Sequence, residues 1–590
     1  MIAKRWIGRT KDVRRDAASS LARALEISEV LAHLLIARGI EDTEAAQKFL
    51  HPSHDQLHDP ALMRGMAEAV TRILRAIDTQ EKILIYGDYD VDGTTGTVVL
   101  RRALHLLDAH TGFHVPHRFT EGYGLNQAAL EKARDEGYTL IISVDCGIRA
   151  HECLQWARSV GLDVIVTDHH LPDEDASALA AHAVLNPNQR NCSYPDKNLA
   201  GVGVAFKLAH ALLRARGREH LIAGFMKMVA IGTVADVAQL VGENRTIVAL
   251  GLADLPHATN PGLRALMEVA GCRDKRQLTA YDLGFRLGPR INAAGRMDAA
   301  HAVIELFEAT DEEEARRLAA YLDARNRERQ AVQREITERA LAELKIEEAN
   351  NTSHVGVIAG ENWHRGVIGI AASKIAEHIN RPCIIISIED GIGHGSARSI
   401  ETYHLLDGLT ACGDLFEKFG GHAHAAGLTI KREHIPHLRR RLNEHAAMLL
   451  ADEDLIPLLY VDAELPSSAL TLALVEQLSV LEPFGPGNPR PVFITRNLQL
   501  TSEPRVMKDR HLKLHLTGMD GEPLEAVWWG GVEKPDGRTL HAGQCIELAY
   551  TLEANTWRDE TRLQLNVQDM RKASVKNQGA ESGIVSKLIQ

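Results

Sequence analysis

The most informative segment of this chain is Lys82-Ile-Leu-Ile-Tyr-Gly-Asp-Tyr-Asp-Val-Asp-Gly-Thr-Thr-Gly96. Its apolar start is typical of a buried strand in an α/β sheet. The acids Asp88, Asp90 and Asp92 follow, and an apolar helical stretch comes next. Because open α/β sheets place their sites at the carboxyl ends of strands, we expect these acids at a functional edge. Crowded carboxylates repel unless cations neutralise them, which favours a metal site over a plain Asp-Gly turn.

Two later strands repeat this pattern. The run 139–147 leads into Asp145, and the run 163–170 leads into Asp168, His169 and His170. A helical stretch between the two runs makes a βαβ unit, whose right-handed crossover brings the strand ends side by side. One acid at a strand end is common, whereas its repetition with a closing Asp-His-His is a specific signal.

A fourth segment, the apolar helical run 228–236, ends in a further acid, Asp236. A buried carboxylate needs a partner, and backbone amides at a helix end are the alternative to a metal. Oxygen ligands with one or two imidazoles suit Mn²⁺ or Mg²⁺ better than zinc. A pair of such ions can hold the attacking and leaving oxygens of a phosphoryl displacement and can lower the pKa of water. These residues therefore predict metal-dependent phosphoester hydrolysis with two ions.

Four motifs resemble those of the DHH phosphoesterase superfamily: Asp-Tyr-Asp-Val-Asp-Gly, Ser-Val-Asp-Cys-Gly, Thr-Asp-His-His-Leu-Pro and Gly-Thr-Val-Ala-Asp-Val. Aspartate in place of histidine in the first motif is similar to the RecJ family of single-stranded-DNA-specific 5′→3′ exonucleases. The resemblance implies the metal ligands Asp90, Asp92, Asp145, His169 and Asp236. It also implies catalytic roles for three further residues, namely Asp88 at or near the metals, His170 facing the scissile phosphate, and Asp168 orienting His169.

Further residues are expected to bind phosphate. Arginines, glycines and an asparagine in the stretch 284–297 indicate an anion-binding loop, although a glycine can equally mark a tight turn. The stretch from residue 354 to 430 resembles the DHHA1 domain that accompanies DHH cores, including its Gly-Gly-His motif. The resemblance assigns binding of the 5′-phosphate or DNA to Arg118, Arg290, Asn292, Ser396, Arg398 and His422.

The remaining chain predicts a long helix and a β-rich domain. No Gly or Pro occurs from Asp311 to Lys345, so a connecting helix of about 50 Å is expected, with Thr310 as its N-cap. Alternating apolar segments between 498 and 567 fit an OB-type β-barrel, which the RecJ resemblance also implies. Trp528 and Trp529 must point to opposite faces, so one belongs to the core and the other can stack on a base.

The expected fold class is therefore a multi-domain α/β protein with a DHH parallel-sheet lobe, a connecting helix, a DHHA1 α/β lobe and a C-terminal OB-type barrel. The domain boundaries expected are 1–307 (N-terminal cap and DHH domain), 308–345, 346–455, 456–572 and a polar tail 573–590. The length of 590 residues suits about three to five domains. The net charge of −12 means that any nucleic-acid binding needs local basic patches.

The seven scattered cysteines and the absence of a signal-like apolar segment favour a cytoplasmic protein with free thiols. The resemblance implies a metal-dependent exonuclease in DNA repair and recombination that binds single-stranded DNA and releases 5′-mononucleotides. Its implied partners are single-stranded-DNA-binding protein and a repair helicase. One alternative is a DHH phosphodiesterase acting on short oligonucleotides or cyclic dinucleotides. Another is a non-catalytic scaffold that binds single strands.

Overall fold

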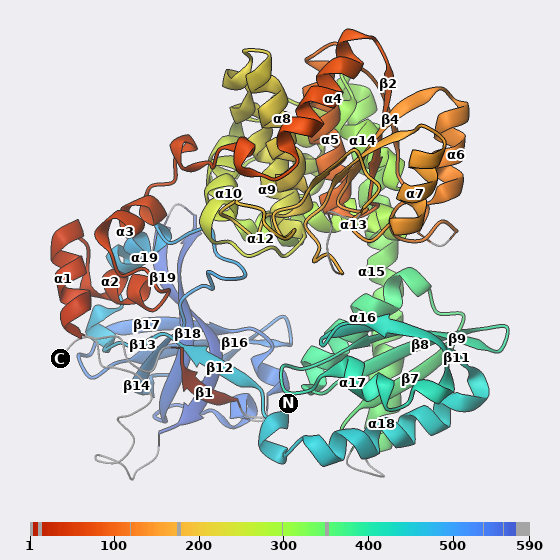
Figure 1. Cartoon of the computed structure of the whole chain (residues 1–590). Coiled ribbons are helices and arrows are strands. Elements are labelled where there is room, and N and C mark those ends of the chain that lie inside the picture. The colour runs from red at the N-terminus through yellow and green to blue at the C-terminus, as the bar shows by residue number, and fades with distance from the viewer. Residues whose placement is uncertain are drawn as a thin grey trace. The chain divides into compact units, whose positions relative to one another are not determined.

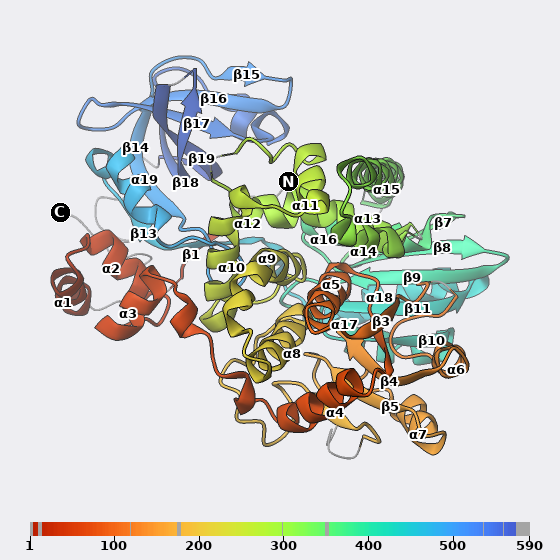
Figure 2. The ribbon, with the colours of Figure 1, turned by 90° about the horizontal axis from the view of Figure 1, so that it is seen from above.

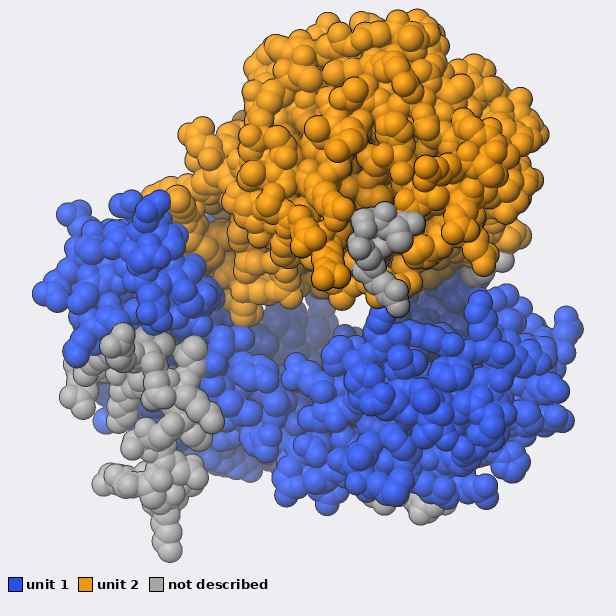
Figure 3. All heavy atoms as spheres, in the orientation of Figure 1, with its two compact units in different colours: residues 1–47, 330–480, 490–590 blue, residues 48–329, 481–489 orange. Residues whose placement is uncertain are grey.

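The chain forms two compact units in a computed structural model (Figure 3). Unit 1 comprises residues 1–47, 330–480 and 490–590, and unit 2 comprises residues 48–329 and 481–489. The structure describes residues 4–9, 15–118, 120–173, 179–275, 277–297, 299–348, 353–534, 536–558 and 560–573. The expected polar tail, apart from residue 573, lies outside this described part.

Unit 2 contains the parallel sheet that the sequence predicts. Its strand order is β3 (His110–His114), β2 (Lys82–Gly87), β4 (Tyr138–Val144), β5 (Asp163–Thr167) and β6 (Ala183–Leu185). All neighbouring pairs are parallel. Because successive side chains of a strand point to opposite faces, Ile83 and Ile85 enter one apolar core, and Leu84 and Tyr86 enter another.

Helices cover both faces of this sheet (Figure 2), as a fully buried parallel sheet requires. The core on one face includes residues of α4 (Met66–Asp78), α5 (Val91–His105) and α8 (Gly201–Ala215). The core on the other face includes residues of α6 (Gln127–Asp135) and α7 (His151–Ser159). This arrangement leaves the carboxyl ends of the strands as the edge where polar side chains gather.

The rest of unit 2 is a helical layer with its own apolar core. It consists of α9 (Met226–Ala235), α10 (Gly242–Asp254), α11 (Pro261–Val269), α12 (Ala280–Asp282), the π-helix η6 (Leu283–Leu287), α13 (Gly288–Arg296), α14 (Ala300–Glu308) and the start of α15 (Glu312–Glu348). The stretch 284–297 is therefore helical and not the expected loop, because Pro289 stands near the start of α13, where proline is well tolerated.

The expected long connecting helix is present as α15, but its cap differs from the expected one. The side chain of Asp311, not Thr310, accepts the amide of Glu314 at 2.8 Å. Asp311 thus satisfies an amide of the first turn, as an N-cap residue does. The boundary between the two units at residues 329 and 330 falls inside this helix.

A short segment far along the chain, residues 481–489, belongs to unit 2, although the residues on either side of it belong to unit 1. The amide of Leu240 donates to the carbonyl of Pro486 at 2.7 Å, and Arg245 donates to the carbonyl of Glu482 at 2.7 Å. Gly485 lies so close to Leu240 that a Cβ at this glycine would be 2.7 Å from its Cδ1. The segment therefore supports the loop between α9 and α10.

The middle part of unit 1 is a second α/β layer (Figure 1). Its sheet has the order β10 (Phe416–Gly421), β11 (Ala425–Lys431), β9 (Ile392–Arg398), β8 (Cys383–Glu389) and β7 (Gly356–Glu361). The second half of α15 shares one apolar core with α16 (Arg365–Ile379). The other core includes residues of α17 (Leu405–Thr410) and α18 (Ile435–Leu449).

The C-terminal part of unit 1 is a seven-stranded sheet whose strands close a ring. The order is β13 (Ala463–Glu464), β14 (Phe493–Leu500), β18 (Cys545–Trp557), β19 (Glu560–Lys572), β17 (Pro523–Trp528), β16 (His511–Thr517) and β15 (Arg505–Met507). Pairing of β14 with β16 closes the ring. The helix α19 (Leu472–Ser479) precedes β14. The predicted fold class is thus confirmed, with this ring at the expected place of the OB-type domain.

The N-terminal residues 1–47 belong to unit 1, whereas from the sequence they were expected in one domain with the DHH fold. The strand β1 (Arg5–Gly8) pairs in parallel with β12 (Leu458–Val461), and Trp6 Nε1 donates to Asp569 Oδ2 at 2.7 Å. The helices α1 (Arg15–Leu25), α2 (Glu29–Ile36) and α3 (Thr43–Leu50) follow. Strand pairing between distant segments leaves no local sequence signal. Among the described residues, no helix combines the length and apolarity needed to cross a bilayer.

Candidate metal centre

Hydrogen bonds of the parallel sheet align the acids at the strand ends. The amide of Asp88 donates to Val144 O at 3.1 Å, and the amide of Asp145 donates to Thr167 O at 2.9 Å. The amide of Asp168 likewise donates to Leu185 O at 3.0 Å. Each acid therefore continues the ladder just beyond its strand. The acids of neighbouring strands stand side by side at the edge where α/β sheets place their sites.

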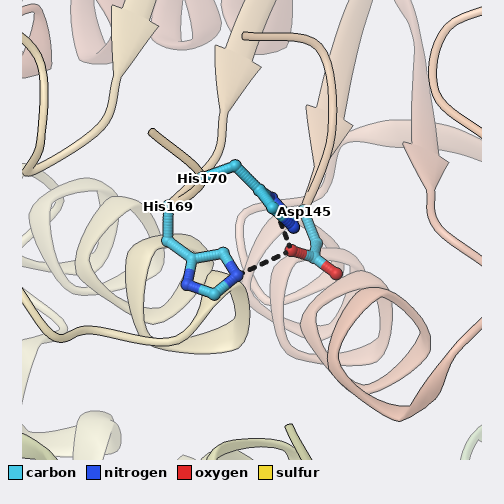
Figure 4. Close-up of side chains that lie close together, drawn as sticks. All are labelled: Asp145, His169 and His170. Atoms are coloured by element: carbon cyan, nitrogen blue, oxygen red, sulfur yellow. Dashed lines mark ion pairs between the residues drawn. The ribbon is translucent and has the colours of Figure 1, made fainter. Parts of the chain in front are cut away.

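All five expected metal ligands meet at this edge. Three groups have ligand atoms within 4.8 Å of one another: Asp145 with His169 and His170, Asp92 with His169 and Asp236, and Asp88 with Asp90 and Asp145. Figure 4 shows the first group, in which both imidazoles point toward the Asp145 carboxylate. His169 Nε2 lies 3.3 Å from Asp145 Oδ1, and His170 Nδ1 lies 3.7 Å from the same oxygen.

Helix starts hold two of these carboxylates. Asp90 caps α5 by accepting the amide of Gly93 at 3.0 Å. Asp92 accepts the amides of Gly201 and Val202 at the start of α8, each at 2.7 Å. The positive end of a helix dipole favours a carboxylate at such a place. A Cβ at Gly201 would lie 2.7 Å from Asp145 Oδ1, so only glycine allows α8 to approach the centre this closely.

Burial and mutual repulsion raise the pKa values of the carboxylates, so their charged forms are unfavourable without a cation. Burial and the charge of Asp90 raise the pKa of Asp92 to about 7. Burial and the charges of Asp92 and Asp90 raise the pKa of Asp236 to about 9. The pKa of Asp88 and that of Asp145 are also raised, mainly by burial. A nearby cation would reverse these shifts, since it stabilises the charged form of a carboxylate.

The donor atoms of the cluster fit divalent metal ions. Asp88 Oδ1, Asp145 Oδ1 and His169 Nε2 are buried and have no hydrogen-bond partner among the described residues. Buried polar atoms are normally satisfied, so unsatisfied atoms that point together require an explanation, and a bound ion supplies it. Burial and the charge of His170 lower the pKa of His169 to about 4, which keeps this imidazole neutral and able to ligate. Oxygen-rich sites with one or two imidazoles suit Mn²⁺ or Mg²⁺.

Asp168 positions His170 rather than His169, contrary to the expectation from sequence. Its Oδ1 lies 2.8 Å from His170 Nδ1 and also accepts the amide of His169, while Oδ2 accepts the amide of Ile148 at 2.9 Å. Burial alone would lower the pKa of His170, but the hydrogen bond and charge of Asp168 raise it overall. His170 therefore stands beside the metal ligands with its ring orientation fixed.

Two asparagines of the site were missed from the sequence. Asn186 and Asn188 follow the three-residue strand β6 and donate to the backbone carbonyls of His170 and His169, each at 2.8 Å. They fix the backbone of the Asp-His-His segment. A short strand followed by Asn-Pro-Asn is typical of a plain turn, so the sequence does not distinguish these residues. Their position after the next parallel strand was the signal that could have identified them.

A pocket of about 300 Å³ lies over the acids in unit 2. Its lining includes Asp88, Asp90, Asp92 and Asp236 together with Arg118, Asn292 and Arg296. The expected residues Arg118 and Asn292 are thus close to the metal ligands. Arg296 was not singled out from the sequence. Its spacing of four residues from Asn292 on one helix was the available signal.

Arg290 is held by protein partners in this structure. It forms an ion pair with Asp323 at 2.9 Å and donates to the carbonyls of Arg286 and Val269. Its side chain is only 17% exposed. It is absent from the residues that line the pocket, so its expected contact with phosphate stays a prediction.

The other expected phosphate ligands lie in unit 1. Ser396 and Arg398 stand two residues apart on β9, and Arg398 donates to Ser396 Oγ at 3.2 Å. Gly369 of α16 approaches this pair, since a Cβ there would be 3.0 Å from Ser396 Oγ. His422 follows β10, is exposed, and its amide donates to Ala425 O at 2.8 Å. Ser396 and Arg398 on β9 thus form a polar cluster next to the first half of α16.

The two tryptophans take opposite environments, as expected from their adjacency. Trp528 is 3% exposed and belongs to the core of the ring, whereas Trp529 is 58% exposed. The ring of Trp529 meets His511 edge-on with centroids 4.8 Å apart. Trp529 is therefore the residue that can offer a ring to a base.

Known families match three parts of the chain. Residues 82–233 match the DHH family, N-terminal domain, residues 350–448 match the DHHA1 domain, and residues 461–569 match the RecJ OB domain. The metal ligands on the strand ends fall inside the first match. The polar cluster on β9 falls inside the second, and the ring of strands falls inside the third.

Curated relatives are similar over nearly the whole chain. The single-stranded-DNA-specific exonuclease RecJ of Bacillus subtilis is 39% identical over 558 residues, which cover 94% of this chain and 69% of the relative. The protein of the same name from Escherichia coli K12 is 34% identical, with 94% of this chain and 98% of the relative covered.

Solved structures give the same result. RecJ of Thermus thermophilus in complex with Mn²⁺ superposes with a TM-score of 0.81 at 29% identity, covering 97% of this chain and 80% of the other. The complex of the same protein with Mg²⁺ gives a TM-score of 0.77 at 28% identity, covering 97% of this chain and 79% of the other. The chain therefore belongs to the RecJ family of single-stranded-DNA-specific exonucleases.

Proposed function

We propose that this chain is a divalent-metal-dependent exonuclease that degrades single-stranded DNA from its 5′ end and releases 5′-mononucleotides. One observation carries the proposal: seven carboxylate and imidazole side chains converge at one sheet edge, with buried donor atoms that lack partners among the described residues. Membership of the RecJ family supports the choice of single-stranded DNA as substrate. DNA repair and recombination are the processes we assign to this activity.

Each residue of the centre has a role in this proposal. Mn²⁺ or Mg²⁺ would be held by Asp90, Asp92, Asp145, His169 and Asp236. Asp88 would lie at or near the metal ions, beside Asp90 and Asp145. Two such ions supply an activated water molecule and neutralise charge on the phosphate. His170, oriented by Asp168, faces the phosphate and can stabilise or protonate an oxygen. Arg118, Asn292 and Arg296 surround the pocket with donors that suit phosphate oxygens.

The 5′→3′ direction is the part of the proposal that most needs a test. The cluster of Ser396 and Arg398 supplies a hydroxyl and a guanidinium, which suit a terminal phosphate. Arg290 and His422 are proposed as additional phosphate contacts, and Trp529 as a base-stacking side chain. From the family we also propose single-stranded-DNA-binding protein and a repair helicase as partners, and a cytoplasmic location.

An oligonucleotide carrying different labels at its two ends tests the function. We expect the 5′ label to leave at once as a mononucleotide in Mn²⁺ or Mg²⁺, while the blunt duplex survives. Asp145→Ala should abolish cleavage, and Asp135→Ala, which changes an exposed acid whose ion pair is with the adjacent Arg134, should not.

Other results would favour other functions. Early loss of the 3′ label would refute the direction. Cleavage of only very short oligonucleotides would favour a small-substrate phosphodiesterase. Binding of single strands without cleavage in either metal would favour the scaffold. Slower cleavage by Arg398→Ala of 5′-phosphorylated but not 5′-hydroxyl strands would support the terminal phosphate site.

A further inference from the structure

The helix α9, which leads to Asp236, ends in an unusual turn. The amide of Val237 donates to Val234 O at 3.2 Å. The amide of Ala238 donates to Thr233 O at 3.3 Å. These two hydrogen bonds form a Schellman motif, in which glycine normally occupies the left-handed position. Here Val237 occupies that position, with a φ of 63°. A β-branched side chain is strained in this conformation, because its Cβ crowds the backbone.

The strain at Val237 acts on its neighbour Asp236, an expected metal ligand. Val237 is 67% exposed, so packing of its side chain does not offset the strain. The Asp236 carboxylate lies 3.9 Å from His169 Nε2, and the two residues form one group of candidate ligands with Asp92. A change of Val237 to a negative φ would rotate the backbone beside Asp236. Because strained backbone persists only where its surroundings hold it, the chain after Val237 must be fixed.

Residues 481–489 hold that chain three residues after Val237. The amide of Leu240 donates to the carbonyl of Pro486 at 2.7 Å, and the Leu240 side chain is only 1% exposed. Gly487 fits closely against the same loop, since a Cβ there would lie 2.5 Å from Gln239 Oε1. The loop that leaves Asp236 is therefore fixed by a hydrogen bond and by close packing, both from this segment.

Internal hydrogen bonds make the segment a firm support. Asn488 is 1% exposed, and its Nδ2 donates to the carbonyls of Leu481 at 2.8 Å and Pro483 at 2.9 Å. The buried Arg245 of α10 donates to the carbonyl of Glu482 at 2.7 Å. The segment is thus closed on itself and attached to the helix that follows the loop.

We propose that residues 481–489 are a positioning element of the metal centre, which holds the chain after Val237 and thereby keeps Asp236 in place to ligate its ion. The inference rests on the proposed function, in which Asp236 is a metal ligand. The segment falls inside the residues that match the RecJ OB domain, yet it belongs to the compact unit that contains the metal centre. It therefore contributes to metal binding although it touches neither ion nor substrate.

Mn²⁺ titration of two glycine variants provides the first test. Gly487→Ala places a Cβ at a φ of 74°, 2.9 Å from Val241 Cγ1. Gly161→Ala is the matched control in the same unit, because its φ is 76° and nothing lies within 4 Å of a Cβ there. We expect only Gly487→Ala to weaken binding of the Asp236 ion, by about 10- to 100-fold, as loss of support for a metal ligand does. Excess Mn²⁺ should restore kcat, and KM for single-stranded DNA should be unchanged.

Two double variants test whether the effect passes through Asp236. In the Asp236→Asn protein, Gly487→Ala should lower Mn²⁺ affinity by less than about a further twofold, because the ligand that the segment supports is already lost. In the Val237→Gly protein, Gly487→Ala should cost much less affinity than in the wild type. Glycine adopts the left-handed conformation without strain, so the turn no longer depends on the support.

Amide hydrogen exchange in EDTA provides a readout that needs no metal. Gly487→Ala should speed exchange at Leu240 and leave exchange in the strand β2 unchanged, since a local support is lost and the fold is not. Faster exchange throughout unit 2 would show general destabilisation and would refute the positioning element.

The outcomes separate this element from the function on which it rests. If Asp236→Asn binds Mn²⁺ as tightly as the wild type, the proposed ligand role of Asp236 fails. If Asp236→Asn weakens Mn²⁺ binding and Gly487→Ala does not, the positioning element is refuted. It is also refuted if the effects of Asp236→Asn and Gly487→Ala add in full, or if Val237→Gly leaves the cost of Gly487→Ala unchanged.

Discussion

Asp168 accepts a hydrogen bond from Nδ1 of His170 at 2.8 Å, and the remaining capacity of its carboxylate is taken by the backbone amides of Ile148, His169 and His170. Burial would raise the pKa of Asp168, but the hydrogen bond and charge of His170 and these amides lower it overall. The carboxylate is therefore ionised and occupied by protein donors. It orients a ring rather than binding a metal.

Asp168→Asn should lower kcat while leaving metal affinity nearly intact. Asparagine removes the charge that holds His170 in its orientation, and loss of such a supporting residue typically costs 10- to 100-fold in activity. We expect a fall in kcat of that size and a change in Mn²⁺ affinity of less than about threefold. Single-turnover kinetics and Mn²⁺ titration measure the two quantities. A loss of Mn²⁺ affinity as large as the loss of kcat would show that Asp168 is itself a ligand.

Gly201→Ala should damage the metal centre, and Gly203→Ala should not. A Cβ at Gly201 would lie 2.7 Å from both Cβ and Oδ1 of Asp145, whereas the atom nearest to a Cβ at Gly203 would be Leu199 Cδ2, the end of a flexible side chain, at 3.2 Å. Both positions are in α8, where alanine favours the helix more than glycine does. We expect at least a roughly tenfold loss of Mn²⁺ affinity from the first variant alone. Equal Mn²⁺ titrations for the two variants would contradict this geometry.

Asp145→Asn should raise the thermal stability of the metal-free protein, while Asp92→Ala should lower it. Burial raises the pKa of Asp145, so at neutral pH a carboxylate that is ionised in the unfolded chain must take up a proton on folding, which lowers the stability of the metal-free fold. Asp92 instead accepts two amides at the start of α8, and leaving buried amides unpaired costs about 1–3 kcal/mol each. Thermal unfolding in EDTA measures both shifts. A lower melting temperature for Asp145→Asn would indicate that the carboxylate stabilises the empty site.

Metal binding should release protons and weaken as the pH falls. The pKa of Asp236 is raised to about 9 and that of Asp92 to about 7, so the metal-free centre retains protons at pH 7 that an ion must displace. Below pH 7 more protons must leave, and the apparent affinity falls. Calorimetry of Mn²⁺ binding in two buffers with different ionisation enthalpies counts these protons. Asp236→Asn should reduce the number released; an unchanged number would exclude Asp236 as their source.

The strand ends were predictable because adjacency in a parallel sheet follows from local rules. The first strand, Lys82–Gly87, is followed by alternating acids, the second by one acid and the third by Asp-His-His. Once the crossovers are right-handed, these three groups must meet at one edge of the sheet. The register of the sheet confirms this. Asp236 was also predictable, because a buried carboxylate at the end of an apolar helix needs a partner, and a metal ion or backbone amides are the main choices.

Contacts that depend on helix rotation or on distant pairing were not predictable. Arg290 and Arg296 both lie in α13, and the face that each occupies decides that Arg296 lines the pocket while Arg290 pairs with Asp323. The interpretation of this stretch as a loop hid that difference. The N-terminal strand and its partner β12 are separated by most of the chain, and sequence patterns carry no information on such pairing.

The support of the α9–α10 loop by residues 481–489 has a consequence for synthesis on the ribosome. Unit 2 lacks this support when residue 329 has emerged, and it is complete only after residue 489 follows. At about 5–20 residues per second, the interval is roughly ten to thirty seconds. During that time the nascent chain carries a nearly finished catalytic unit whose Leu240 amide has not yet met Pro486. A stop codon placed before residue 481 would make that unfinished state permanent.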